Sequence, residues 1–344
     1  TQANGTTLAF GSSTSLNGNL SFAGDSAIEV ASGITVWKDT AGVMGTNSAG
    51  ATVRKTGAGT LVIGTNNMGF GAGAAVIVDE GTLQLNKGNW YSGSVMGQAS
   101  LTINQAGTVN VTANHVFDAF SGLVINVNGG TLTGGAISFY AGGVNMTGGL
   151  VSVQMNNVAT VTTNASAQTA VISGFLNIYD RGFTATVADG TAEVDLRVTS
   201  TNQAFTKAGA GWMQLIGAAP TRDIAITGGT REVAGAAGAV ANVAIGTGTS
   251  LRFNRADDVT HAATLSGAGT VVHAGAGKLT LSGTNSFTGG LTLAGGTLAL
   301  GTSLSGGTGS LAIGSALANL ELGSGIEVTR TTLGGSGTLT KSGA

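Results

Sequence analysis

The fold is decided by residues 275–300, which read GAGKLTLSGTNSFTGGLTLAGGTLAL. Leucine occupies every second position of three short runs in this stretch, and turn-forming residues such as Gly, Ser and Asn lie between the runs. Alternation of apolar and polar residues with a period of two is typical of half-buried β-strands, and the residues between the runs are turn formers. The stretch therefore predicts short strands joined by tight corners, with Leu279, Leu281, Leu298 and Leu300 pointing inward.

The beginning of this stretch belongs to a motif that recurs along the chain: a basic residue, one further residue, and then Gly-x-Gly before a strand. Copies start at Lys55, Lys207 and His273, and the beginning of a fourth starts at Lys341. A longer unit also repeats, because residues 243–246 and 265–270 resemble residues 311–314 and 333–338, each 68 positions later. Matched places in the repeat predict that Leu61 and Leu83 also point inward.

The spacing of the strands indicates how they are connected. From Leu279 to Leu298, Leu320 and Leu339 the intervals are 19, 22 and 19 residues. These intervals are too long for tight hairpins throughout and shorter than a strand-helix-strand crossover of about 30 residues. They suit the coils of an all-β parallel β-helix, or β-solenoid, with about 20 residues per coil. We predict a single elongated solenoid over residues 1–344, with clear repeats at 53–85, 205–217 and 243–344 and a degenerate middle at 86–200.

Composition excludes several kinds of function. Lys and Arg number 14 against 16 Asp and Glu, the formal net charge is -2, and only 9% of the residues are charged. A chain without a basic excess neutralises few phosphates, so we expect no nucleic-acid partner. The absence of cysteine excludes disulfides and thiolate metal sites. We further expect no catalytic residues, no cofactor, no metal and no transmembrane segment, since no apolar run approaches about 18 residues.

Residues 275–300 closely resemble the autotransporter-associated β-strand repeat, which occurs in passenger regions of bacterial type V secreted proteins and in very large surface proteins. A weaker copy spans residues 57–85, and a third begins at Lys207 and degenerates after Gly217. The resemblance implies that the β-helix is right-handed, that the protein is exported and exposed on the cell surface, and that the repeat serves transport and folding of the passenger. It implies no chemistry.

One candidate catalytic motif lies near the amino terminus. Asp25 and Ser26 follow a glycine, as in some serine hydrolases, but Ala27 stands where a protease would carry Gly. A serine triad needs a histidine within about 3 Å. The nearest histidine in the sequence, His115, should lie about four coils away. We therefore favour a turn before the strand at residues 27–30.

A second candidate is the dense polar cluster of Arg252, Arg255, Asp257, Asp258 and His261. Glycoside hydrolysis requires two carboxylates about 5 to 9 Å apart. Adjacent Asp residues in an extended segment point to opposite sides, which works against such a pair. The cluster is favoured as a solvated turn, and a β-helical carbohydrate-active enzyme remains the alternative.

A third candidate lies in the alternating run at residues 191–198. The alternation predicts that Glu193, Asp195 and Arg197 share one face, where a cation could sit between Glu193, Asp195 and Asp189. A Ca²⁺ site needs about six to eight oxygen ligands and no resident arginine, so a solvent-exposed face is favoured.

The aromatic residues give two further expectations. Trp90 and Tyr91 are adjacent, so at most one of them belongs to the core, and the other covers an apolar seam in preference to stacking on a sugar. Phe117 and Phe120 are expected to fill the interior. The Gly-x-Gly elements are not phosphate-binding loops, because a strand follows them where such a loop requires a helix.

Three classes of function remain open. The first is a non-enzymatic structural or adhesive solenoid of a bacterial surface protein, with surface glycans or matrix as partners. The second is the subunit of an extracellular filament, a homo-polymer that stacks through the solenoid ends. The third is the carbohydrate-active enzyme. Residues 341–344 repeat only the start of the motif, which predicts that the native polypeptide continues or that another subunit covers this edge.

Overall fold

The computed structural model describes residues 3–38, 44–46, 48–64, 68–70, 73–86, 90–92, 100–112, 123–138, 142–177, 182–199, 204–217, 222–234, 241–328 and 333–341. Within these ranges all regular structure is β, in 39 strands. The strands pair in parallel in stacked coils of roughly 21 residues per turn, which confirms the predicted β-solenoid. The chain forms two compact units, Thr1–Arg181 and Gly182–Ala344, here named unit 1 and unit 2.

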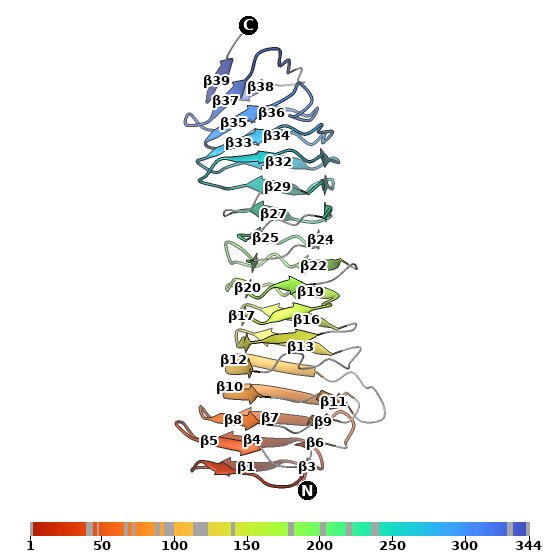
Figure 1. Ribbon diagram of the computed structural model, residues 1–344, viewed down its shortest axis with the longest axis vertical. Coiled ribbons are helices and arrows are strands. Elements are labelled where there is room, and N and C mark those ends of the chain that lie inside the picture. Colours follow the sequence, from red (N-terminus) through yellow and green to blue (C-terminus); the bar gives the residue numbers. More distant parts are fainter. Residues whose placement is uncertain are drawn as a thin grey trace. The chain divides into compact units, whose positions relative to one another are not determined.

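In unit 1 the strands of successive coils build three ladders, numbered in the order in which the chain visits them (Figure 1). The first ladder contains β1 (Thr6–Phe10), β4 (Ser26–Val30), β7 (Thr52–Thr56), β10 (Ala75–Leu85), β12 (Ser100–Val111), β13 (Val124–Asn128), β16 (Gly143–Thr147) and β19 (Thr160–Thr163). The second contains β2 (Thr14–Ser15), β5 (Thr35–Lys38), β8 (Thr60–Ile63), the later halves of β10 and β12, β14 (Thr131–Gly134), β17 (Leu150–Val151) and β20 (Ala170–Ile172). The third contains β3 (Leu20–Phe22), β6 (Met44–Thr46), β9 (Met68–Phe70) and β11 (Trp90–Ser92), and separately β15 (Ala136–Ser138), β18 (Gln154–Asn156) and β21 (Leu176–Asn177).

Unit 2 repeats this plan with three ladders of its own (Figure 1). Its first ladder contains β22 (Phe183–Val187), β24 (Phe205–Ala208), β26 (Ile224–Ile226), β28 (Val243–Ile245) and β31 (Leu265–Ser266). Its second contains β23 (Leu196–Val198), β25 (Trp212–Leu215), β27 (Thr230–Val233), β29 (Ser250–Phe253), β32 (Thr270–His273), β34 (Leu291–Leu293), β36 (Leu311–Ile313) and β38 (Leu333–Gly335). Its third contains β30 (Val259–His261), β33 (Lys278–Leu281), β35 (Thr297–Leu300), β37 (Asn319–Leu322) and β39 (Thr338–Lys341).

Inward side chains of successive coils stack in columns and form the core of each unit. Leu61 pairs with Leu83 in unit 1, and Leu279 pairs with Leu298 in unit 2. The six leucines predicted to point inward are at most 3% exposed, which confirms the predicted alternation: Leu61, Leu83, Leu279, Leu281, Leu298 and Leu300. Burying a leucine side chain contributes about 1.5 to 3 kcal/mol, so these columns dominate the stabilisation of the coils.

The Gly-x-Gly motif marks a corner between two ladders, but the corner differs among copies. The motifs of Lys55 and Lys207 lead from the first ladder to the second, whereas that of His273 leads from the second to the third. The 68-residue unit shows the same shift. Its first copy places residues 243–245 in the first ladder, and its second places residues 311–313 in the second. One such unit therefore spans three full coils and the step from one ladder to the next, so equivalent residues of two successive units lie on neighbouring ladders.

Glycine is required at these corners for two reasons. Gly57 and Gly209 have positive φ angles of 71° and 77°, which residues with a side chain rarely adopt. A Cβ atom on Gly209 would lie 2.3 Å from the carbonyl oxygen of Val187 in the preceding coil. The corner glycines thus allow the backbones of neighbouring coils to approach at the ladder spacing.

Two predictions about organisation are not tested. The weakly repetitive residues 86–181 still carry all three ladders within unit 1, but the single solenoid over residues 1–344 stays a prediction. Lys341 ends β39, and residues 342–344 lie outside the described residues. That a further segment or a second subunit covers this edge also stays a prediction.

Candidate functional site

The serine motif of unit 1 forms a turn in which both polar side chains bind the backbone. Ser26 Oγ donates to the carbonyl oxygen of Gly24 at 3.2 Å, and Asp25 Oδ1 accepts the N–H of Thr52 at 2.8 Å. His115, the histidine nearest to it in sequence, lies outside the described residues. Asp25 therefore fixes the next coil, and the hydroxyl group of Ser26 is bound to the backbone of its own turn.

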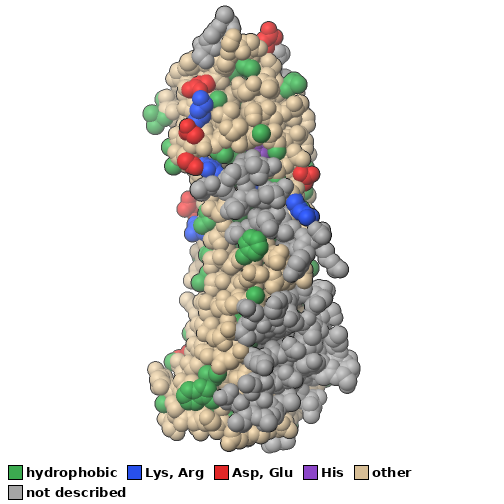
Figure 2. Space-filling model, in the orientation of Figure 1, with side chains coloured by type: hydrophobic (Ala, Val, Ile, Leu, Met, Phe, Trp, Pro, Cys, Tyr) green, Lys and Arg blue, Asp and Glu red, His purple; other side chains and the backbone are tan. Residues whose placement is uncertain are grey.

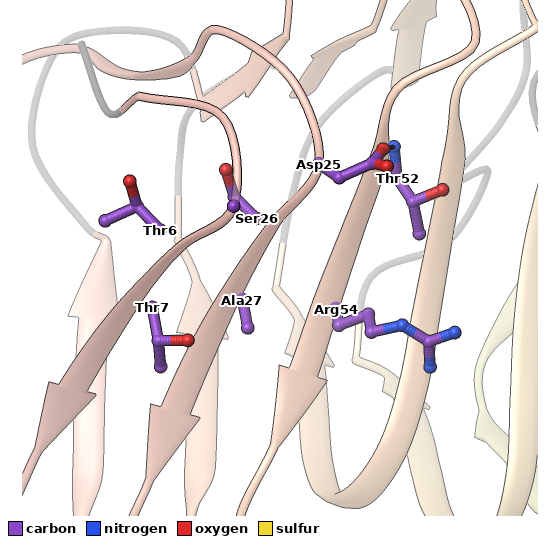
Figure 3. A pocket seen from close by; sticks show the side chains of 8 residues that line it. Thr6, Thr7, Asp25, Ser26, Ala27, Thr52 and Arg54 are labelled. Carbon is purple, nitrogen blue, oxygen red and sulfur yellow. Dashed lines mark hydrogen bonds between the residues drawn. The ribbon is translucent and has the colours of Figure 1, made fainter.

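A depression of about 300 Å³ opens beside this turn on the outer face of the first ladder (Figure 3). Ala27 lies in register between Thr7 of the preceding coil and Arg54 of the next, so a small side chain separates two larger ones. Arg54 Nη1 forms an ion pair with Asp79 Oδ2 at 2.6 Å. The depression is lined by Gly5, Thr6, Thr7, Asp25, Ser26, Ala27, Thr52 and Arg54. Its hydroxyl groups and one paired cation can bind a polar molecule.

The five polar residues at positions 252–261 do not converge on one site. Arg255, which is 5% exposed, holds Asp257 through two hydrogen bonds, from Nε to Oδ1 at 3.0 Å and from Nη2 to Oδ2 at 2.5 Å. This guanidinium lowers the pKa of the Asp257 carboxyl, so Asp257 is a poor proton donor at neutral pH. Asp258 Oδ1 accepts the N–H of Lys278 at 2.8 Å. His261 is buried and packs edge-on against Phe253, with 5.7 Å between the ring centroids.

The predicted common face of Glu193, Asp195 and Arg197 is wrong for Asp195. The strand begins only at Leu196, so the alternation does not extend back to Asp195, which is 6% exposed. Its carboxylate accepts the N–H groups of Gly190 at 2.8 Å and Trp212 at 2.7 Å. Glu193 is exposed, and Arg197 Nε instead reaches Gln214 at 2.8 Å in the next coil.

The aromatic predictions fall on parts of the chain that the structure does not describe at the side-chain level. Trp90 and Tyr91 lie in β11, and the placement of their side chains stays a prediction. Phe117 and Phe120 lie outside the described residues.

Rows of hydrogen-bonded side chains connect the outer faces of successive coils in unit 1. Asn145 Nδ2 donates to Asn126 Oδ1 at 3.0 Å, and Asn126 Nδ2 donates to Thr102 Oγ1 at 3.4 Å. Beside this row, Asn128 donates to Asn104 at 3.3 Å and Asn104 donates to Asp79 at 2.7 Å. These outward amides are bound to one another along the stack of coils.

Unit 2 carries a charged version of such a row on its second ladder. Gln214 Nε2 donates to Glu232 Oε1 at 2.7 Å, and Arg252 Nε pairs with Glu232 Oε2 at 2.9 Å. The Arg252 guanidinium also lies 5.4 Å from the centre of the Trp212 ring. Figure 2 shows acidic and basic side chains of unit 2 beside one another, while uncharged polar residues and backbone cover most of the other described surface. The charges thus neutralise one another within the unit.

Two absences hold for the described residues. They contain no group of three or more His, Cys, Asp or Glu side chains that could hold a metal ion. They also contain no helix that is long and apolar enough to cross a membrane.

Comparison with known proteins bears on the repeats. Residues 53–85 and 271–300 match the model of the passenger-associated-transport-repeat family. Two segments of the chain are therefore similar to this repeat. The first runs from β7 to the end of β10 and includes the corner after Lys55, and the second runs from β32 to β35. No curated protein and no solved structure matches the chain.

Sequence reasoning noticed the basic residue of the motif but missed its burial. Lys55, Lys207 and His273 are at most 2% exposed. A signal for this was present, because each of them lies two residues after an inward apolar residue in its strand, for example Lys207 after Phe205. The lysine corners are therefore interior features of the repeat.

Proposed function

We propose that the chain is a non-enzymatic structural solenoid that serves as a passenger-like stalk in a bacterial secreted or cell-surface protein. The two segments similar to the passenger-associated-transport-repeat and the stacked-coil fold support this proposal. The observation that carries it is the use of the outward side chains. In the described rows they bind the next coil of the same chain, as Asn145 binds Asn126 and Arg252 binds Glu232.

Such rows suit a stalk for a physical reason. Amide ladders along stacked strands add hydrogen bonds in the same direction as the backbone ladder. Because each coil contacts only its neighbours, these bonds reinforce every interface between coils. A side chain held in this way is not free to move a proton or attack a substrate. The stalk would therefore gain stiffness from residues that an enzyme would keep available.

The test has two parts. Antibodies raised against residues 1–344 should label intact cells of the native host, with an internal protein as control for leakage. The purified chain should release no products from a panel of plant and microbial polysaccharides. Labelling only after permeabilisation would contradict surface exposure. Product release that Asp257→Asn abolishes, with folding unchanged, would establish the carbohydrate-active alternative.

A second candidate function, adhesion to glycans, rests on the depression over Ala27. Its lining of hydroxyl groups suits the hydrogen-bonding groups of a sugar. Ala27→Leu should fill the depression without entering the core, because Ala27 is on the outer face of β4. Ala9→Leu, on the exposed face of β1, is the matched control. Glycan-array binding that Ala27→Leu removes and Ala9→Leu retains would support adhesion at this site, and equal binding by both variants would contradict it.

A further inference from the structure

Among the described residues three lysines are buried at inward positions, Lys38, Lys55 and Lys207, and the last two belong to the Gly-x-Gly motif. Lys55 pairs in register with Ile28 of the preceding coil and Val78 of the next. Lys207 pairs with Ala185 and Ile226 in the same way. Lysine is almost never fully buried unless it has partners, so these two positions require an explanation beyond packing.

Both ammonium groups make the same set of contacts. Lys55 Nζ donates to the carbonyl oxygens of Thr56 at 2.9 Å, Gly57 at 2.6 Å and Glu80 at 3.0 Å. In unit 2, Lys207 Nζ donates to the corresponding three carbonyls at 3.0, 2.9 and 2.9 Å, those of Ala208, Gly209 and Gly228. In each set two oxygens belong to the corner after the lysine, and the third belongs to the next coil.

We propose that the lysine of this motif is an internal cation clamp, whose ammonium group binds three backbone carbonyls and ties each coil to the next at the corner. An ammonium has three donors and no acceptor, so its valence matches the three oxygens. A shorter side chain in this column would not reach these oxygens. An apolar side chain of similar length would fill the space but could not donate to them. The clamp gives the basic residue of the repeat a physical role.

The corner carbonyls need this donor. Gly57, Gly209 and Gly228 lie outside the strands, and among the described residues the structure gives their carbonyl oxygens no hydrogen bond other than that from lysine. These glycines are half-buried, so an oxygen that loses its donor there is only partly open to water, which is destabilising. Removing the ammonium group therefore leaves two such oxygens at the Lys207 corner.

Charged residues near the clamps bear on their protonation. Burial lowers the pKa of both lysines to about 8, and the nearby acids, Glu80 for Lys55 and Asp195 for Lys207, oppose this shift. Around Lys55, Arg54 and Asp79 pair with each other on the outer face, and Glu29 is exposed.

Around Lys207, Asp189 is exposed and Arg197 points outward to Gln214, and the buried Arg231 guanidinium lies 5.7 Å from the centre of the Phe205 ring. The paired strands β22 and β26 carry no charged residue. A pKa of about 8 leaves both lysines mostly protonated at neutral pH, so all three donors are present.

The primary test replaces the clamp with an apolar side chain of similar length. In Lys207→Met, native-state hydrogen exchange should accelerate roughly tenfold or more at the amides of Gly211 and Thr230, which flank the corner, because two carbonyls lose their donor. Ile226→Met, at the same place in the next coil, is the matched control and should change these rates much less. Unchanged exchange in Lys207→Met, or the same acceleration in Ile226→Met, would overturn the clamp.

A second measurement covers the case in which the variant does not fold. Lys207→Ala is refolded with propylammonium chloride or, at the same ionic strength, with tetramethylammonium chloride. Propylammonium carries three N–H donors and should raise the recovery and melting temperature of the variant, while having no such effect on the wild-type chain. Tetramethylammonium carries none and should have no effect. Equal rescue by both salts, or rescue by neither, would contradict the assignment of the carbonyls as an ammonium site.

Discussion

The corners at Lys207 and His273 carry the same sequence motif, yet they lie at different places in the coil and use different chemistry. At the first, one ammonium group binds three carbonyls. At the second, His273 Nε2 makes one hydrogen-bond contact, with the carbonyl oxygen of Gly277 at 3.0 Å, and backbone groups of Phe253 and Thr297 also lie near the ring. The Gly277 oxygen also accepts the N–H of Thr297 at 3.2 Å. The comparison indicates that the glycines define the corner. The contribution of the basic residue to stability depends on how many carbonyl oxygens have no other hydrogen-bond donor.

The strongest way to break this comparison is to remove the glycine of the lysine corner. Gly209→Ala should lower the free energy of unfolding by about 3 kcal/mol or more. The left-handed backbone accounts for about 1 to 2 kcal/mol of this loss, and the rest comes from the clash with the preceding coil. Gly248 has a similar φ of 73° but open space around its Cβ position, so Gly248→Ala should show only the smaller cost. Denaturant unfolding measures both losses, and equal losses would contradict the role of close approach between coils.

The pH dependence of stability in the alkaline range distinguishes the lysine corner from the histidine corner. Burial lowers the pKa of Lys207 from 10.5 to about 8 in the folded chain. Between these values the unfolded chain binds more protons, so the stability contributed by this group rises with pH from about 8 to about 10.5 and is constant below that range. Lys207→Met should show a smaller rise than the wild type, in urea melts across this range, while Lys55 retains its own contribution. Identical slopes in the two proteins would contradict the lowered pKa.

The change of stability in the acidic pH range tests the role of His273. Burial lowers its pKa below 6.5, and nearby backbone groups, Gly277 first, partly oppose this shift. The unfolded chain therefore binds more protons as the pH falls through about 6.5, and stability declines. His273→Leu should remove this decline. At neutral pH it should cost less than about 1 kcal/mol, since Gly277 keeps the hydrogen bond from Thr297. A loss at neutral pH as large as that of Lys207→Met would show that the two corners are equivalent.

An ion pair away from both corners provides the smallest expected effect. Lys278 Nζ lies 2.5 Å from Glu321 Oε2, but the two side chains are 39% and 36% exposed. Glu321→Gln should change the free energy of unfolding by less than about 1 kcal/mol, and the change should shrink as salt is added. Thermal melts at low and high ionic strength measure it. A larger, salt-independent change would show that outer ion pairs stabilise the coils as strongly as the interior clamps.

Much of the fold could be predicted because it depends on local alternation. The inward leucines, the β-solenoid and the length of the coil all follow from the period-2 runs and their spacing, and the structure confirms them. The phase of the repeat could not be predicted. The same motif, a basic residue and Ala before Gly-x-Gly, forms different corners at Lys207 and His273. The chain visits three ladders in turn, and the motif does not indicate which ladder comes next.

The candidate sites were harder to predict from the sequence, because the groups that bind their side chains come from other coils. The carbonyl of Gly228, 21 residues away, completes the Lys207 clamp, and no local sequence pattern predicts this contact. Adjacency in sequence was misleading in the opposite sense. Asp257, Asp258 and His261 are close in the chain, but they bind a guanidinium, a backbone amide and an aromatic ring in separate surroundings.

The shift of the 68-residue unit from one ladder to the next has a consequence for how such a chain can change by duplication. Inserting one unit by recombination within unit 2 would move every later residue one ladder onward, and deleting one unit would move it one ladder back. Loops and polar rows that faced one direction would then face another, by about a third of a rotation, although no residue had been substituted. Three successive insertions would return the loops and polar rows to the direction that they originally faced. Gain or loss of a single repeat could therefore alter which surface is displayed to antibodies or ligands while leaving the stacking of the coils intact.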